Sequence, residues 1–187
     1  HEAQQWKVQL GIPTDAFVFL FAGKMEPKKN PLLLIRSFMR LKEKNLRLIL
    51  VGNGVLEEAI RRLILLDQRI SFLGFQNQSR MPVVYRMADR YVLPSAGPGE
   101  TWGLAVNEAM ASGVPCIISS KCGCAADLGT LPGNQVFESN NETSLMQAMQ
   151  QAATAARSLK EDIPASFSDF YSISYLAGVI EKEICRL

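Results

Sequence analysis

Short apolar runs alternate with helical stretches along most of this chain, and this alternation is the feature that most constrains the fold. The first two runs, residues 16–22 (AFVFLFA) and 47–51 (RLILV), are apolar at nearly every position rather than at every second position. Strands of this kind are buried on both faces, as in parallel sheets. The further predicted strands are residues 70–73, 90–94, 114–119 and 135–137.

Helical stretches separate these strands and follow the last of them. The predicted helices are residues 31–44, 55–66, 81–88, 103–112, 124–128, 142–156 and 173–184. Strand–helix alternation favours right-handed crossovers, so we expect an α/β fold with a doubly wound, Rossmann-like parallel sheet of about six strands and helices on both faces. Ligands of such sheets bind beyond the carboxyl ends of the strands.

Length and charge exclude several classes of partner. The 187 residues suit a single domain with a substantial core. A formal net charge of +2 is too small to indicate nucleic acid or an anionic membrane as partner. The N-terminal segment lacks the basic and apolar regions of a signal peptide, and no apolar run approaches the ~20 residues that span a bilayer. We therefore expect a cytoplasmic protein.

The cysteines form no recognisable metal or redox motif. Cys122 and Cys124 are one residue too close for C-x-x-C, Cys116 and Cys185 lie elsewhere, and the only histidine is His1. We expect buried or idle thiols and no metal site.

The loops after the first four predicted strands carry polar residues of a consistent kind. They contain Gly23, Lys24, Lys28, Lys29, then Gly52, Asn53, Gly54, then Gly74, Phe75, Gln76, and finally residues 95–103. Because these loops share one edge of the sheet, their cations, glycines, aromatic ring and acid are expected together, a combination that suits a nucleotide diphosphate. Lys24 and Lys29 would bind the diphosphate as point charges, the alternative being ordinary surface lysines. Gly23 and Gly103 would let the backbone approach a ligand, the alternative being turn chemistry.

The predicted helix at residues 103–112 (GLAVNEAMAS) is apolar on nearly every side, which favours burial. Its N-terminal amides would attract an anion beside the preceding loop. Glu108 lies inside this helix, and none of the residues three or four positions away is basic. A buried carboxylate requires hydrogen-bond donors, which sugar hydroxyls would supply. The alternative is an arginine or lysine from elsewhere in the fold.

Two residues just before this helix have open alternatives. Glu100 either accepts a hydrogen bond from a ligand hydroxyl or caps the amides of the helix. The ring of Trp102 is expected to pack in the core rather than to form a wall of the site.

Residues 100–108 (ETWGLAVNE), followed by AMASGVP up to residue 115, resemble the E-x7-E segment of the family 4 retaining glycosyltransferases. These enzymes have the GT-B architecture, in which two Rossmann-like domains face each other across a cleft. Residues 21–29 (FAGKMEPKK) resemble their phosphate loop, usually written G-R-x-x-x-x-K. Residues 50–54 (LVGNG), 72–74 (FLG) and 88–95 (ADRYVLPS) also match in order and spacing.

The resemblance implies the donor-binding domain of an enzyme that transfers a hexose, with retention, from a UDP-sugar or GDP-sugar to an acceptor. Glu108 would bind the ribose hydroxyls and Glu100 the donor hexose. Lys24 and Lys29 would neutralise the leaving diphosphate. The backbone at Phe75 and Gln76 would face the base. The sugar and phosphates would be contacted by the backbone at Gly23, Thr101, Trp102, Gly103 and Leu104. The family generally requires no metal or other cofactor.

Two features depart from the family pattern. Lys24 stands where arginine is usual, which keeps the charge but loses the bidentate fork. The family's N-terminal acceptor domain, of comparable size, is not among residues 1–187, which are expected to be one nucleotide-sugar-binding domain whose terminal helix at 173–187 returns toward that missing domain.

The missing half has consequences for activity. The fragment alone is expected to be inactive, and any peripheral membrane contact of the parent would lie in the missing half. A non-catalytic nucleotide-sugar-binding module, or another GT-B enzyme such as a sugar-nucleotide epimerase, are the open alternatives.

Overall fold

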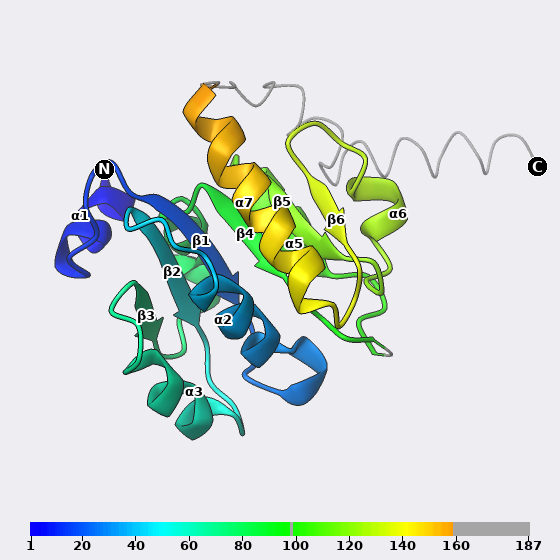
Figure 1. Ribbon diagram of the computed structural model, residues 1–187, viewed down its shortest axis with the longest axis horizontal. Coiled ribbons are helices and arrows are strands. Elements are labelled where there is room, and N and C mark those ends of the chain that lie inside the picture. Colours follow the sequence, from blue (N-terminus) through cyan, green and yellow to red (C-terminus); the bar gives the residue numbers. More distant parts are fainter. Residues whose placement is uncertain (98, 159–187) are drawn as a thin grey trace, which may run out of the picture.

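The computed structural model describes residues 1–97 and 99–158, which form one six-stranded sheet with helices on both faces (Figure 1). The strands are β1 (Phe17–Ala22), β2 (Leu46–Val51), β3 (Ile70–Leu73), β4 (Arg90–Leu93), β5 (Cys116–Ser119) and β6 (Gln135–Phe137). Their order is β3-β2-β1-β4-β5-β6, and every pairing in the described residues is parallel. The predicted doubly wound α/β sheet is confirmed.

The helices follow the predicted alternation. They are α1 (Glu2–Gln9), α2 (Pro31–Met39), α3 (Glu57–Ile64), α4 (Met81–Tyr85), α5 (Leu104–Ala111), α6 (Ala125–Leu128) and α7 (Glu142–Ser158), with single 3-10 turns η1 (Pro27–Lys29) and η2 (Gln78–Arg80). The predicted helices at 173–184 and 173–187 lie outside the described residues. None of the helices in the described part of the chain is long and apolar enough to cross a membrane.

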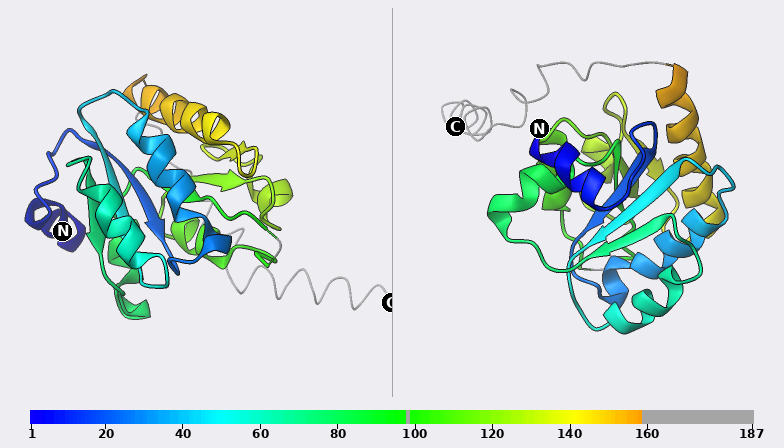
Figure 2. Two further views of the ribbon diagram at one scale, coloured as in Figure 1. Left: turned by 60° about the horizontal axis from the view of Figure 1, so that its bottom comes forward. Right: turned by 90° about the vertical axis from the view of Figure 1, so that its left-hand side faces the viewer.

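The central strand β1 explains the continuous apolar runs. Its six residues are all buried, and they alternate between two core clusters. Val18 and Leu20 pack on the face covered by α1, α4, α5 and α6, whereas Phe19 and Phe21 pack on the face covered by α2, α3 and α7 (Figure 2). Because both faces of the strand are covered, neither set of alternate residues is polar.

Two helices differ from the sequence prediction. Nothing in the apolar pattern predicts α1, since its residues (EAQQWKVQ) are mostly polar and none is fully buried; Trp6 and Ala3 provide its partly buried contacts. The helix predicted at residues 31–44 ends at Met39. Just beyond Met39, the backbone is hydrogen-bonded to the side chain of Arg69.

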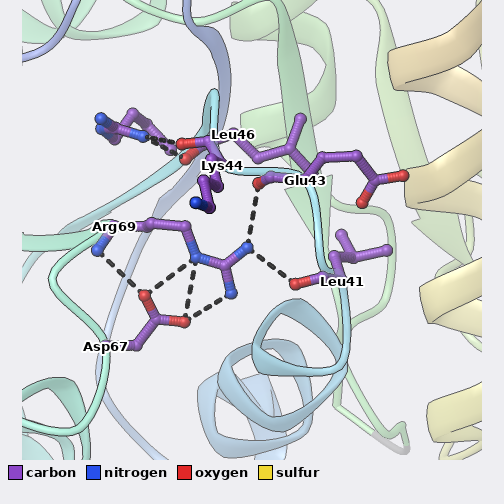
Figure 3. A network of polar contacts seen from close by, with 7 residues as sticks. Leu41, Glu43, Lys44, Leu46, Asp67 and Arg69 are labelled. Atoms are coloured by element: carbon purple, nitrogen blue, oxygen red, sulfur yellow. Dashed lines mark hydrogen bonds and ion pairs between the residues drawn. The ribbon is translucent and has the colours of Figure 1, made fainter.

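Arg69, just before β3, holds the loop that joins α2 to β2 (Figure 3). Its Nη1 donates hydrogen bonds to the carbonyl oxygens of Leu41 at 2.7 Å and Glu43 at 3.1 Å. Its Nη2 lies 2.6 Å from the carboxylate of Asp67, and its guanidinium stacks 4.8 Å from the ring centre of Phe38. The hydrogen bond from Arg69 is the largest influence on Asp67 and holds the pKa of that carboxyl below its ordinary value of 3.8.

Replacing Arg69 with methionine is expected to lower the free energy of unfolding by about 2–4 kcal/mol, because two carbonyls and one carboxylate lose their partner. The Arg69 side chain is only 18% exposed, which limits replacement of these bonds by water. Urea denaturation of the purified chain measures the change. The matched control is Arg62→Met, whose side chain is 77% exposed in an i,i+4 pair with Glu58. That control should change stability by less than about 0.5 kcal/mol.

The effect should also depend on pH. Since the folded Asp67 carboxyl has a lowered pKa, its ion pair contributes stability above about pH 4, and this contribution is lost as the pH falls through the folded pKa. The difference between the unchanged chain and Arg69→Met should therefore shrink in acid. Equal losses in the two arginine variants at neutral pH would contradict the assignment.

Candidate functional site

A pocket of about 290 Å³ opens at the carboxyl ends of β1, β2 and β3, where their loops meet α4 and α5. Five residues that the sequence predicts as site residues line it: Gly23, Lys24, Phe75, Gln76 and Glu108. They come from two loops, those after β1 and β3, and from one helix, and parallel pairing of the strands brings them together. The expectation that these loops share one edge of the sheet is confirmed.

Glu108 projects from α5 and is half-buried at the pocket wall. Its Oε2 accepts a hydrogen bond from the hydroxyl of Tyr85 at 2.8 Å, and its Oε1 accepts one from the side-chain amide of Gln78 at 3.1 Å. Both partners are neutral, so the structure does not support the alternative that an arginine or lysine pairs with Glu108. A carboxylate has about four acceptor positions, so about two remain for a ligand.

The expectation that α5 is buried holds for one face of the helix only. Val106, Ala109 and Met110 are buried, whereas Leu104 is largely exposed and Glu108 faces the pocket. The helix is apolar where it contacts the core, but it also has small or apolar residues at exposed positions. Composition alone does not distinguish these two faces.

Glu100 lies in a second acidic site, in the loop between β4 and α5. Its Oε2 forms an ion pair with Lys29 Nζ and accepts a hydrogen bond from the hydroxyl of Ser95 at 2.8 Å. The side chains of Lys29 and Glu100 are 23% and 12% exposed, and Ser95 is fully buried. The α5 N-terminus has no side-chain cap, so the capping alternative for Glu100 is wrong.

The two predicted diphosphate lysines have different partners. Lys24 is exposed at the pocket, and its Nζ lies 3.8 Å from Oε1 of Glu26, whose Oε2 lies 3.6 Å from the Nζ of Lys28. Lys29 instead pairs with Glu100. The structure therefore brings Lys24 into the pocket and places Lys29 beside the loop that leads into α5.

The segment at residues 101–104 leads into α5 and is exposed except at Gly103. Thr101 and Leu104 are exposed. Gly103 has φ +105°, and a Cβ there would lie 2.9 Å from a methyl group of Leu93, so the turn itself requires glycine. Trp102 is 38% exposed, and its indole N–H donates to Asn107 Oδ1 at 2.8 Å, so the expectation that its ring packs in the core is wrong. Because its N–H is already hydrogen-bonded to a residue of α5, the indole can lie at the surface.

The structure adds residues that the sequence did not indicate. Tyr85 and Gln78 hold Glu108, and Ser95 holds Glu100. Gly123 lies behind the loop at residues 101–104, where a Cβ would approach the Thr101 carbonyl oxygen to 1.8 Å. In the sequence, Gly123 stands out only by lying between Cys122 and Cys124, and that arrangement matches no known motif.

The cysteines of the described residues are buried and free, as expected. Burial raises the pKa of the Cys122 thiol to about 12 and that of Cys124 to about 11, so both stay protonated near neutral pH. Cys185 lies outside the described residues.

Residues 2–162 match the family described as glycosyl transferases group 1. The chain belongs to this family. Among the glycosyltransferases that resemble it, the D-inositol 3-phosphate glycosyltransferase of Corynebacterium efficiens is 34% identical over 149 residues, covering 74% of this chain and 32% of that protein.

A second relative is the UDP-Gal:alpha-D-GlcNAc-diphosphoundecaprenol alpha-1,3-galactosyltransferase of Escherichia coli, 33% identical over 119 residues, covering 59% of this chain and 30% of that protein. The chain therefore spans about a third of the length of these two curated relatives.

Solved glycosyltransferase structures share the fold. The structure of Anabaena Alr3699/HepE in complex with UDP-glucose superimposes with a TM-score of 0.80 at 19% identity, covering 100% of this chain and 53% of that one. The catalytic domain of the cholesterol-alpha-glucosyltransferase of Helicobacter pylori gives a TM-score of 0.68 at 23% identity, covering 87% of this chain and 98% of that one. The resemblance to GT-B glycosyltransferases is confirmed.

Proposed function

We propose that this chain binds the nucleotide-sugar donor of a retaining glycosyltransferase that transfers a hexose to an acceptor. The observation that carries the proposal is Glu108: it faces a pocket at the strand ends with two neutral partners and unused acceptor capacity. A ribose offers two adjacent hydroxyl donors, which match what the carboxylate lacks.

The rest of the pocket suits a nucleoside. Phe75 is 69% exposed although it lines the pocket, which leaves a ring face free to stack on a base. A Cβ at Gly23 would meet only the ring of Phe21 at 3.5 Å, an ordinary contact, so the fold leaves room there for a ligand. The backbone at Phe75 and Gln76 would face the base. Uridine is favoured, since one structural relative holds UDP-glucose and one sequence relative is named for UDP-Gal.

The second acidic site suits the reacting end of the donor. Glu100 would accept hydrogen bonds from the hexose, and backbone amides of Thr101, Trp102, Gly103 and Leu104 would contact the sugar and phosphates. In the transfer, the bond between the anomeric carbon and the diphosphate oxygen breaks, and the diphosphate leaves with the electron pair. The acceptor oxygen bonds to the same face of that carbon, and its proton passes to the departing diphosphate oxygen. Lys24 and Lys29 would stabilise the charge that develops on the diphosphate, without a metal.

The remainder of the enzyme would lie in another domain. The chain covers about half of Alr3699/HepE, which supports an acceptor domain facing this one. In this proposal residues 1–187 are the nucleotide-sugar domain, and the chain alone binds donor without transferring sugar. The parent would act in the cytoplasm, and any contact with the face of a membrane would belong to the acceptor domain.

Calorimetric titration of the 187-residue chain with UDP, GDP and ADP tests the proposal. UDP should bind, and Glu108→Ala should weaken that binding by about 10- to 100-fold, because the ribose loses its charged acceptor. The control Glu58→Ala removes a carboxylate from the exposed face of α3 and should leave UDP affinity unchanged. Absence of binding of all three nucleotides at millimolar concentration would reject the function.

A further inference from the structure

Tyr85, the last residue of α4, lies beneath the pocket and is only 2% exposed. Its hydroxyl donates to Glu108 Oε2 at 2.8 Å, across the junction between α4 and α5. The two residues are 23 positions apart in the chain, so this contact is a product of the tertiary fold.

The ring of Tyr85 is fixed by the core. It packs edge-to-face against Tyr91, with ring centres 5.5 Å apart and an angle of 77° between the planes. Tyr91 is itself fully buried, and its hydroxyl donates to the carbonyl oxygen of Ala22, the last residue of β1, at 3.1 Å. Because both rings are buried and pack against each other, the Tyr85 hydroxyl occupies a defined position relative to the loop that follows β1.

The second partner of Glu108 is held differently. Gln78 lies in η2 and is exposed, so its amide can rotate into water when a ligand enters. Tyr85 is therefore the fixed donor and Gln78 the replaceable one. With Oε2 oriented by Tyr85, the unused acceptor positions of the carboxylate are directed at the pocket that Glu108 lines.

We propose, resting on the donor-binding function above, that Tyr85 is a positioning residue that orients the Glu108 carboxylate toward the ribose hydroxyls and so sets the preference of the site for ribonucleotides. Burial, and then the hydrogen bond to Glu108, raise the pKa of the Tyr85 hydroxyl well above its ordinary value of 10, so it remains a donor.

The test compares UDP with 2′,3′-dideoxy-UDP as ligands of the 187-residue chain. The ribose preference is the ratio of the two dissociation constants, measured by calorimetry. Tyr85→Phe keeps the ring against Tyr91 and removes only the donor, so it should lower the ribose preference at least about fivefold while affinity for the dideoxy ligand changes less than about twofold. In a Glu108→Ala background the same substitution should have no further effect on the ratio.

Tyr91→Phe is the matched control, because it removes a buried tyrosine hydroxyl from the same ring pair but one that bonds to Ala22 rather than to Glu108. It should leave the ribose preference unchanged even if it lowers Tm. A merely structural Tyr85 would lower Tm and weaken both ligands equally, or would alter neither affinity. Either result overturns the inference, as does an equal loss of ribose preference in both tyrosine variants.

Failure of the proposed function has a different signature. In that case the unchanged chain binds neither ligand, and both the function and this inference are rejected. Failure of the inference alone leaves UDP binding and ribose preference intact in the unchanged chain.

Discussion

Replacing Lys29 with methionine is expected to weaken UDP binding by about 10- to 100-fold. Lys29 is the cation that neutralises Glu100, and both side chains are mostly buried. The substitution removes a positive charge proposed to contact the diphosphate, and it also leaves a carboxylate without its cation close to where that anion would bind. Repulsion between them adds to the loss of attraction. Calorimetric titration with UDP measures the change.

The adjacent lysine is a matched control. Lys28 is exposed and lies 3.6 Å from Glu26, not from Glu100. Lys28→Met removes the same charge one residue away and should change UDP affinity by less than about threefold, the scale of a screened surface charge. If both variants weaken UDP binding equally, the effect is one of net charge and the role assigned to Lys29 is wrong.

A double variant separates the two contributions. In Lys29→Met with Glu100→Gln, no carboxylate is left unpaired beside Ser95, so stability lost in the single variant should be recovered. UDP affinity should recover only in part, since the cation for the diphosphate is still missing. Complete recovery of UDP affinity would mean that Lys29 acts only through Glu100.

Gly52→Ala is expected to lower the free energy of unfolding by about 3–5 kcal/mol and to abolish measurable UDP binding. Gly52 has φ +135°, and a Cβ there would lie 1.9 Å from the carbonyl oxygen of Gly23. The obstacle is backbone, so no side-chain rotation relieves it. Relief requires the loops after β1 and β2 to separate, although the Met25 N–H bonds to the Asn53 carbonyl at 2.8 Å. That movement would open the pocket that Gly23 and Gly52 both line.

Gly74→Ala provides the comparison. Gly74 follows β3 just as Gly52 follows β2, but it has ordinary φ and no atom within 4 Å of its would-be Cβ. That variant should change stability by less than about 1 kcal/mol. Urea denaturation and UDP calorimetry on both variants give the result. If Gly52→Ala is as stable as Gly74→Ala, the loops after β1 and β2 separate without cost, and the close approach of Gly52 to Gly23 does not require glycine.

The positions of the candidate site residues were predicted correctly where the sheet alone places them, and incorrectly where a particular side-chain contact places them. Five of them line one pocket, because strand ends of a parallel sheet meet at one edge whatever the side chains are. Trp102 was misplaced because an indole is both apolar and a donor, and the sequence does not reveal the acceptor on Asn107. The early end of α2 depends on Arg69, which lies 28 residues beyond the Leu41 carbonyl that it binds.

The sequence by itself determined the sheet and the edge at which a ligand would bind, because burial of a strand on both faces leaves a continuous apolar run that can be read locally. Only the tertiary structure decided which groups hold the two acids. Lys29 and Glu100 are 71 residues apart, and Tyr85 and Gln78 reach Glu108 from 23 and 30 residues away. Such pairs form where segments distant in the sequence meet in the fold. A single hydrogen bond between them produces no repeating pattern in the sequence.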